Sequence, residues 1–231
     1  MPLHCLVTGA NRGIGLAFVG RLLARGDRVV ASCRHPGKAT ALNTLAGEYP
    51  GRLHVLPLDV ADAKSRAELV RELPLVGGRI DLLINNAGVL HSGERFGALS
   101  AAHLEDSFRT NAAGPLLLTE ALAPTLSDGG CVANVSSQLG SIANTTRFGT
   151  PSYNISKAAQ NMATVLLAHA LHDRAIKVVA LHPGWVQTDM GGAGAQITVE
   201  ESVDGLLRVL DGLSPADSGR FLDWRGETLP W

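Results

Sequence analysis

A tyrosine and a lysine four residues apart are the first residues whose types and spacing could do chemistry; they lie in Tyr153-Asn154-Ile155-Ser156-Lys157. On a helix, positions i and i+4 share one face, so the two side chains would point the same way. An ammonium beside a phenol favours the phenolate and is expected to lower the tyrosine pKa. Such a tyrosine can donate or accept a proton. The same pair also occurs by chance on solvated helix faces, so the rest of the chain has to decide.

A glycine-rich turn near the N-terminus is a second candidate site. An apolar run at residues 3–7 precedes it and an amphipathic segment at residues 16–24 follows, the strand–loop–helix context of a nucleotide-phosphate site. Gly9 would permit the sharp turn, Gly13 would let the backbone approach a pyrophosphate, and Gly15 would let the helix pack close to the strand. The phosphates would lie at the helix N-terminus, facing free N–H groups. A plain glycine turn is the alternative, and the flanking strand and helix argue against it.

Basic residues near this turn bear on which cofactor is bound. A cofactor without a 2′-phosphate is usually held by an acidic residue at the end of the second strand, whereas a 2′-phosphate is matched by arginine. That strand, residues 28–32, is followed by Cys33 and Arg34 and by no acid, and Arg12 lies in the glycine turn. A guanidinium binds a phosphate in bidentate fashion, so NADP is favoured over NAD. In the alternative, Arg34 only faces solvent.

Apolar strands alternate with amphipathic helices along the whole chain, which predicts an α/β fold with a parallel sheet. We expect further strands at residues 53–58, 80–84, 130–135, 177–181 and 219–223, and further helices at 37–47, 62–74, 101–124, 151–172 and 199–213. Ligands of such sheets bind at the carboxyl ends of the strands. Asp59, at one such end, could accept a hydrogen bond from an adenine amino group. Alternatively it caps the next helix, although Asp62 is better placed to do so.

Pro115 is expected to interrupt the helix predicted over 101–124. Proline has no N–H, so it cannot bond the carbonyl of Asn111 four residues earlier, and the helix should kink there. A buried free carbonyl needs a partner, often water. The kink could be purely structural. Beside a catalytic lysine, a water held at Asn111 would instead be one link in a proton relay.

Composition favours one globular domain over residues 1–231: hydrophobic residues make up 45% and charged residues 18%. A net charge of -1, from 20 basic and 21 acidic residues, argues against nucleic acid and anionic membrane as partners. The three cysteines are scattered, which indicates a reducing compartment rather than a disulfide framework. With no signal peptide and no apolar run of membrane-spanning length, a cytoplasmic location is expected. The eight histidines show no metal-ligand spacing with carboxylates, so no metal is predicted.

Four separated motifs make the chain resemble the short-chain dehydrogenase/reductases over essentially its whole length. They are Thr8-Gly9-x3-Gly13-x-Gly15, Asn85-Asn86-Ala87-Gly88, Ser137 with Tyr153-x3-Lys157, and Pro183-Gly184 followed by Thr188. Each is weak alone, and together and in order they are specific. The segments around Asn11, Gln138 and Phe221 are similar to the branch that holds C-factor and carbonyl-reductase-like proteins.

The resemblance implies a three-layer, Rossmann-type, doubly wound sheet of seven parallel strands in the order 3-2-1-4-5-6-7. It also implies hydride transfer between a nicotinamide and a carbonyl or alcohol. Tyr153 would donate the proton, Ser137 would orient the carbonyl oxygen, Lys157 would lower the Tyr153 pKa and bind the nicotinamide ribose, and Asn111 would hold a relay water. The implied cofactor contacts are Gly9, Asn11, Arg12, Gly13, Ile14, Gly15, Arg34, Asp59, Val60, Asn85, Ala87, Gly88, Tyr153, Lys157, Pro183, Gly184, Val186 and Thr188.

Two departures from the family pattern concern the substrate side. The loop between Ser137 and Tyr153 is longer than usual, so Ser136 and Ser141 compete for the serine role; Ser137 is preferred because it lies at the strand end. The added loop, residues 138–150, is expected to shape the substrate mouth, and the segment after Thr188 is short, which leaves the pocket open. Candidate pocket residues, each of which could instead belong to the core, are Leu90, His91, Leu139, Phe148, Trp185 and Met190.

Three functions remain open at this point. The first is an NADP-dependent reductase of aldehydes or ketones, and the second is an NAD-dependent alcohol dehydrogenase. The third is a C-factor-like signalling protein with vestigial catalysis, against which the complete set of catalytic residue types argues. Helices 101–124 and 151–172 carry enough apolar residues to form a homodimer interface, although they must also cover the sheet.

Overall fold

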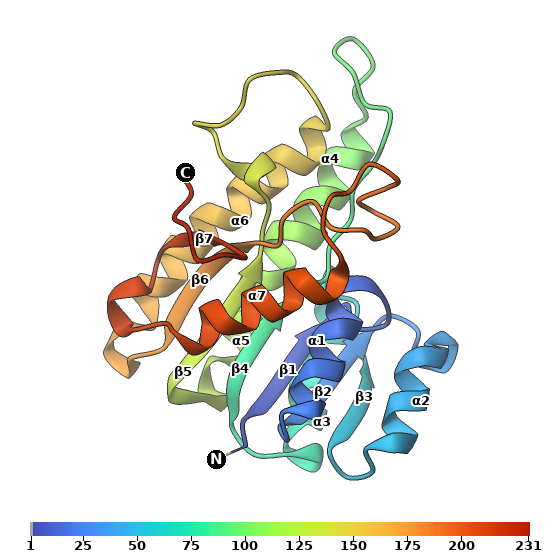
Figure 1. Ribbon diagram of the computed structural model, residues 1–231, viewed down its shortest axis with the longest axis vertical. Coiled ribbons are helices and arrows are strands. Elements are labelled where there is room, and N and C mark those ends of the chain that lie inside the picture. The colour runs from blue at the N-terminus through green and yellow to red at the C-terminus, as the bar shows by residue number, and fades with distance from the viewer. Residues whose placement is uncertain (1) are drawn as a thin grey trace.

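Seven parallel strands form one sheet in the order β3-β2-β1-β4-β5-β6-β7 in the computed structural model, which describes residues 2–231. Helices cover both faces of the sheet (Figure 1). The predicted fold class and strand order are confirmed. The order reverses between β1 and β4, and the crevice at such a switch point is where doubly wound sheets bind ligands.

The elements follow the predicted alternation, with ends displaced by a few residues. The strands are β1 His4–Thr8, β2 Arg28–Cys33, β3 Leu53–Pro57, β4 Ile80–Asn85, β5 Leu126–Val135, β6 Lys177–His182 and β7 Phe221–Asp223. The helices are α1 Gly13–Ala24, α2 Thr40–Glu48, α3 Ala63–Val76, α4 Ala101–Phe108, α5 Gly114–Leu122, α6 Pro151–Ala170 and α7 Val199–Asp211. Asp62 caps α3, as predicted, by accepting from the N–H of Ser65 at 2.7 Å.

Two hydrophobic cores lie on opposite faces of the sheet, and alternate strand residues feed them. Cys5 and Val7 of β1 belong to the core under α1, α2 and α7, whereas Leu6 between them belongs to the core under α3, α5 and α6. Strands buried on both faces read as continuous apolar runs, as these do. Burial of both faces makes the sheet a rigid support for the loops at its carboxyl edge.

The predicted interruption of the long helix is present, but as a π-helical turn rather than a simple kink. Residues Arg109–Ala113 form this turn between α4 and α5, and the N–H of Gly114 donates to the carbonyl of Arg109, five residues earlier. Pro115 follows directly and has no N–H for the carbonyl of Asn111. Gly114 is required here because a Cβ would lie 2.8 Å from the carbonyl oxygen of Val60. The wider turn carries Asn111 into the interior, where it is fully buried.

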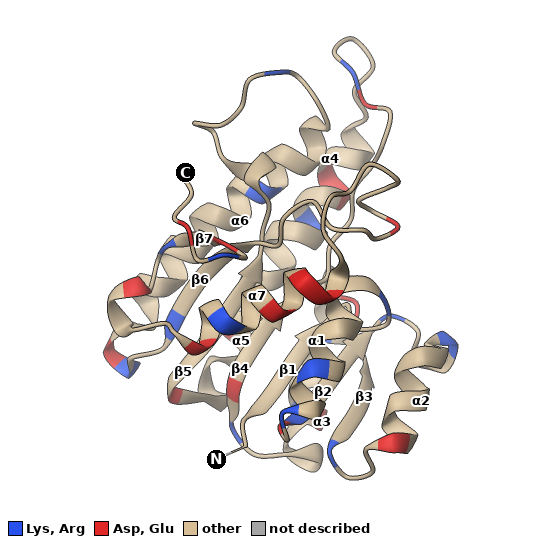
Figure 2. Cartoon of the chain, viewed as in Figure 1, with Lys and Arg blue, Asp and Glu red and all other residues tan. Residues whose placement is uncertain are grey.

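Charge is spread evenly over the molecule. Basic and acidic residues are interspersed along the helices and loops in Figure 2. Among residues 2–231, no helix is both long enough and apolar enough to cross a membrane.

Candidate active site

The glycine loop between β1 and α1 has the conformation and the close contacts that its sequence predicts. Gly9 and Gly13 have φ angles of 64° and 54°, in the left-handed region that favours glycine. A Cβ on Gly9 would lie 2.8 Å from the Cα of Ala87, and a Cβ on Gly15 would overlap the carbonyl oxygen of Gly9. In the described chain, the first turn of α1 holds no acidic residue and its N-cap, Arg12, makes no side-chain cap hydrogen bond. Backbone N–H groups and the positive end of the helix dipole can therefore meet an anion here.

Asn86 ties the glycine loop to the end of β4. Its Nδ2 donates to the carbonyls of Thr8 and Gly9 at 3.0 and 3.1 Å. The Thr8 hydroxyl in turn accepts from the N–H groups of Asn86 and Ala87, both at 3.0 Å. Asn86 belongs to the Asn85-Asn86-Ala87-Gly88 motif but is not among the predicted site residues. The second amide of the Asn-Asn pair was the available signal.

Asn85 was the predicted site residue, and the structure directs its side chain away from the site. Its Nδ2 donates to the Thr119 hydroxyl at 3.1 Å and to Asn134 Oδ1 at 2.9 Å, inside the molecule. Successive residues of a strand point to opposite sides, so only one of the two asparagines can face the loop. The prediction of a cofactor contact by the Asn85 side chain is corrected in this respect.

A cleft of about 800 Å³ runs along the carboxyl edge of the sheet and joins the glycine loop to Tyr153 and Lys157. Most predicted cofactor residues line it: Gly9, Asn11, Arg12, Gly13, Ile14, Arg34, Asp59, Val60, Ala87, Gly88, Tyr153, Lys157, Pro183 and Thr188. Four of the predicted cofactor residues do not line it, namely Gly15, Asn85, Gly184 and Val186. Because the glycine cradle, the free helix end and the cleft are continuous, the residues present fit an extended dinucleotide.

The β2 end of the cleft is basic. Arg34 lines it together with His35 and Lys38, which the sequence prediction did not select. Arg12 lines the cleft too, but its guanidinium is 2.5 Å from the carboxylate of Asp189. Both side chains of that pair are largely exposed, so the contact contributes little to stability. Arg34 and Lys38 also line this end of the cleft, and among residues 2–231 neither forms an ion pair.

Tyr153 and Lys157 share one face of α6, as their spacing predicts, and Lys157 Nζ lies 5.7 Å from the centre of the Tyr153 ring. The ammonium donates to the carbonyl of Val135 at 2.7 Å and to Gln160 Oε1 at 2.8 Å. Burial lowers the pKa of Lys157 to about 7.

The pKa of Tyr153 is raised to about 12 by burial, against which the neighbouring Ser137 hydroxyl lowers it. The expectation that Lys157 brings this pKa down is wrong for the structure as it stands. Both groups lie in the protein interior, where desolvation disfavours each charged form, and the ammonium is directed at oxygens of Val135 and Gln160.

Of the three serines in competition, Ser137 is the one beside the phenol. Its hydroxyl lowers the pKa of Tyr153 by hydrogen bonding to the phenol, and it also accepts from the N–H of Leu139 at 3.2 Å. The Ser136 hydroxyl donates to Asn161 Oδ1 at 2.6 Å, and the Ser141 hydroxyl accepts from the N–H of Asn144. Ser136 lines the cleft and Ser137 does not, but Ser137 is the one whose hydroxyl lies beside the phenol of Tyr153.

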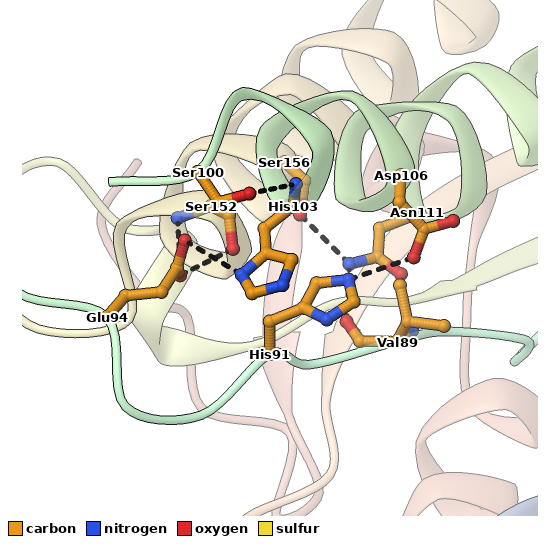
Figure 3. A network of polar contacts seen from close by, with 9 residues as sticks. All are labelled: Val89, His91, Glu94, Ser100, His103, Asp106, Asn111, Ser152 and Ser156. Carbon is orange, nitrogen blue, oxygen red and sulfur yellow. Dashed lines mark hydrogen bonds and ion pairs between the residues drawn. The ribbon is translucent and has the colours of Figure 1, made fainter. Parts of the chain in front are cut away.

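Asn111 joins the loop after β4 to α6 (Figure 3). Its side chain pairs with both main-chain groups of Val89, at 2.8 Å from N and 2.9 Å from O, and donates to the Ser156 hydroxyl at 2.9 Å. That hydroxyl donates to the carbonyl of Tyr153 at 2.7 Å. Asn111 thereby holds together the two segments that bear Gly88 and Tyr153. The links through Val89 and Ser156 were not visible in the sequence.

The predicted substrate residues are only partly brought together. Met190 lines the cleft. Phe148 meets Phe96 edge to face at 5.7 Å between ring centres, and the Trp185 indole donates to the carbonyl of Gly191 at 2.8 Å. Leu139, Phe148 and Trp185 are exposed, and Leu90 is half-buried. His91 does not line the cleft itself, but its Nε2 lies 2.9 Å from Asp106 Oδ2, and Asp106 does line it.

A doubly wound parallel sheet with a glycine cradle at its switch point is the architecture of a dinucleotide-binding protein, and Tyr153 and Lys157 line the same cleft. The chain belongs to the short chain dehydrogenase family, whose model matches residues 3–196.

Two sequence relatives and one solved structure specify the resemblance. The C-signal protein of Myxococcus xanthus is 46% identical over 156 residues, covering 67% of this chain and 94% of that protein. The 1-hydroxy-2-glutathionyl-2-methyl-3-butene dehydrogenase of Rhodococcus sp. (strain AD45) is 35% identical over 230 residues, 98% of each chain. The NADPH-bound carbonyl reductase from chicken fatty liver superposes with a TM-score of 0.93 at 40% identity, covering 100% of this chain and 99% of that one. The chain is thus similar both to C-signal and to carbonyl reductases.

Proposed function

We propose that this protein is an NADP-dependent oxidoreductase that reduces an aldehyde or ketone to an alcohol. The observation that carries the proposal is the placement of the Tyr153 phenol, with the Ser137 hydroxyl beside it, in the same cleft as the glycine cradle. A carbonyl oxygen bound between these two hydroxyls would be polarised and protonated from one side.

Each residue of the site has a defined task in this proposal. A bound nicotinamide supplies the hydride. Tyr153 donates its proton to the carbonyl oxygen, and Ser137 donates a hydrogen bond to the same oxygen and fixes its position. Lys157 binds ribose hydroxyls, and its ammonium stabilises the phenolate that Tyr153 becomes when it gives up its proton. Asn111 fixes the loop after β4 to α6 through its bonds to Val89 and Ser156. It also holds the water that returns a proton to Tyr153.

NADP is proposed over NAD on the basis of the basic end of the cleft. Arg34, His35 and Lys38 line the end of the cleft where a 2′-phosphate is expected, and the second strand ends without an acid. The similarity to an NADPH-bound carbonyl reductase supports the same choice.

The test is NADPH oxidation against a panel of aldehydes, ketones and quinones, with the wild type and Tyr153→Phe side by side. Turnover by the wild type and loss of turnover by at least about a thousandfold in the variant, with unchanged NADPH affinity, is expected because the phenol is the only proton donor proposed. Equal activity of the two proteins would reject the mechanism. Tight NADPH binding without turnover of any carbonyl would favour the signalling function suggested by the similarity to C-signal, and preferred oxidation of alcohols with NAD would favour a dehydrogenase.

We further propose a homodimer formed through α4, α5 and α6. Support comes from apolar side chains left exposed on these helices, namely Phe108, Leu117, Ile155, Met162 and Leu166. Light scattering of the wild type and of Met162→Arg tests this, with a dimer converted to a monomer as the expected result. A cytoplasmic location is proposed as well, supported by the three cysteines, all free and buried.

A further inference from the structure

Glu94 is a buried carboxylate at the N-terminus of the helix that carries Tyr153. Its side chain is only 2% exposed, although it comes from the loop between β4 and α4. Glu94 Oε2 accepts from the Ser152 hydroxyl at 2.6 Å and from the Ser152 N–H at 3.2 Å. Figure 3 shows the carboxylate reaching the first turn of α6 from outside the helix. Ser152 is the residue next to Tyr153, so this contact holds the backbone directly before the catalytic phenol.

The helix needs this contact because its own N-cap is poor. The N-cap residue Thr150 has a left-handed backbone, with φ of 41°, and makes no side-chain cap hydrogen bond within the described chain. Its hydroxyl is instead bonded to Asn154 Oδ1 at 3.0 Å. The first N–H groups of a helix have no intrahelical acceptor, and an anion is favoured at the positive end of the dipole. Glu94 supplies both the acceptor and the charge from a distant loop.

His103 of α4 faces the other oxygen of the same carboxylate. His103 Nδ1 lies 3.9 Å from Glu94 Oε1, and both atoms are buried without a hydrogen-bond partner among the described residues. The main-chain N–H of His103 donates to the Ser100 hydroxyl at the start of α4. The imidazole is therefore the polar group that faces the second oxygen of the buried carboxylate.

The His103 ring is connected to the cleft through His91 and Asp106. It stacks on the His91 ring, with 4.1 Å between ring centres and 4° between the planes. His91 Nε2 lies 2.9 Å from Asp106 Oδ2, and Asp106 lines the cofactor cleft. The β4–α4 loop is thus joined to α6 by Glu94 and to α4 by the two stacked rings.

We propose that Glu94 is a positioning residue for Tyr153: it caps α6 from the β4–α4 loop, with His103 as its polar partner, and so sets where the phenol stands in the cleft. The inference rests on the proposed reductase function for its kinetic consequence, but not for the capping contact. Displacement of a reacting group by about 1 Å can cost about a hundredfold in rate, so a loose first turn would slow catalysis without a change in cofactor binding.

The test compares Glu94→Ala, Glu94→Gln and the control Glu105→Ala, which removes an exposed carboxylate on α4. For Glu94→Ala we expect kcat for carbonyl reduction to fall by about tenfold or more, with the NADPH dissociation constant within about twofold of the wild type. Amide exchange should rise at residues 152–156 and stay unchanged at 163–170. Glu94→Gln keeps an oxygen for Ser152 and places an NH2 toward His103, so its kcat should stay within about threefold of the wild type. Glu105→Ala should leave all three measurements unchanged.

Several outcomes overturn the inference. They are a wild-type kcat in Glu94→Ala, a loss of kcat that accompanies faster exchange along all of α6, or a Glu94→Gln variant as slow as Glu94→Ala. Failure of the proposed function is seen separately, as absence of carbonyl reduction by the wild type. In that case amide exchange at residues 152–156 still decides whether Glu94 caps the helix.

Discussion

Lys157 Nζ lies 2.7 Å from the carbonyl oxygen of Val135, so the end of β5 holds the ammonium that the sequence places beside Tyr153. Gln160 Oε1 is the second acceptor, at 2.8 Å. Two neutral oxygens stabilise the charged form less than a carboxylate would, and burial dominates. The pKa of Lys157 is therefore about 7, so the side chain loses its proton near neutral pH.

Lys157→Met is expected to change how stability depends on pH. The folded-state pKa of Lys157 is lowered from 10.5 to about 7, so the unfolded chain binds more protons than the folded one between these values. The free energy of unfolding of the wild type should consequently rise with pH through this window. Below about pH 7 the folded protein carries the buried charge, which lowers the free energy of unfolding by its full amount. In Lys157→Met this rise should be absent.

Urea unfolding at about pH 6 and about pH 9 measures the effect. Lys64→Met is the matched control, because Lys64 is an exposed lysine on α3. The same slope in Lys157→Met and the wild type would contradict the lowered pKa. Above pH 10 the raised pKa of Tyr153 acts in the opposite direction, since the unfolded tyrosine loses its proton first, so the comparison belongs below that value.

Gly15→Ala should weaken cofactor binding and Gly20→Ala should not, although both glycines lie in α1. A Cβ on Gly15 would overlap the carbonyl of Gly9 and the Asn86 amide, whereas nothing lies within 4 Å of a Cβ on Gly20. Gly15→Ala should weaken NADPH binding by about tenfold or more because the cradle must shift. Gly20→Ala should keep binding intact and raise the free energy of unfolding by up to about 1 kcal/mol. Calorimetric titration and thermal denaturation of both variants check this, and equal affinities would show that the cradle tolerates a side chain.

Arg34→Asp should change the preference between the two cofactors. A carboxylate there would repel the 2′-phosphate of NADPH and could accept bonds from the ribose hydroxyls of NADH. We expect the ratio of the NADPH and NADH dissociation constants to shift toward NADH by about a hundredfold. Arg71→Asp makes the same charge change at an exposed position of α3 and should leave the ratio unchanged. An unchanged ratio in Arg34→Asp would show that Arg34 does not hold the 2′-phosphate, and Lys38 would be the next residue to substitute.

Asn111→Ala should reduce both stability and turnover. It leaves both main-chain groups of Val89, which are partly buried, without their partner and removes the bond to Ser156, which together costs on the order of 3 kcal/mol of unfolding free energy. Turnover should fall further than NADPH affinity because the link to Ser156 and the Tyr153 backbone is lost. Asn43→Ala removes one exposed hydrogen bond to Pro36 and should cost less than about 1 kcal/mol. Denaturant unfolding and steady-state kinetics decide; wild-type kcat in Asn111→Ala would remove it from the proton path.

Local sequence patterns determined the order of the elements and through it the sheet. Alternating apolar runs and amphipathic segments each lie within one window of the chain, and the glycine positions demand backbone that only glycine adopts at low cost. The interruption before Pro115 was predictable for the same reason, since a missing N–H is a property of one residue. With strand ends known, the motifs at Gly9, Ala87 and Tyr153 had to meet at one edge of a parallel sheet.

Only the tertiary structure decided which partner each buried polar group meets. Asn86 rather than Asn85 faces the glycine loop, Lys157 is directed at Val135, and Glu94 caps a helix that begins 57 residues later. These contacts join residues that are far apart in the chain, so no local window contains both partners. Their energies, and the pKa values of Tyr153 and Lys157, depend on burial and on the oxygen or nitrogen that folding brings within hydrogen-bond distance.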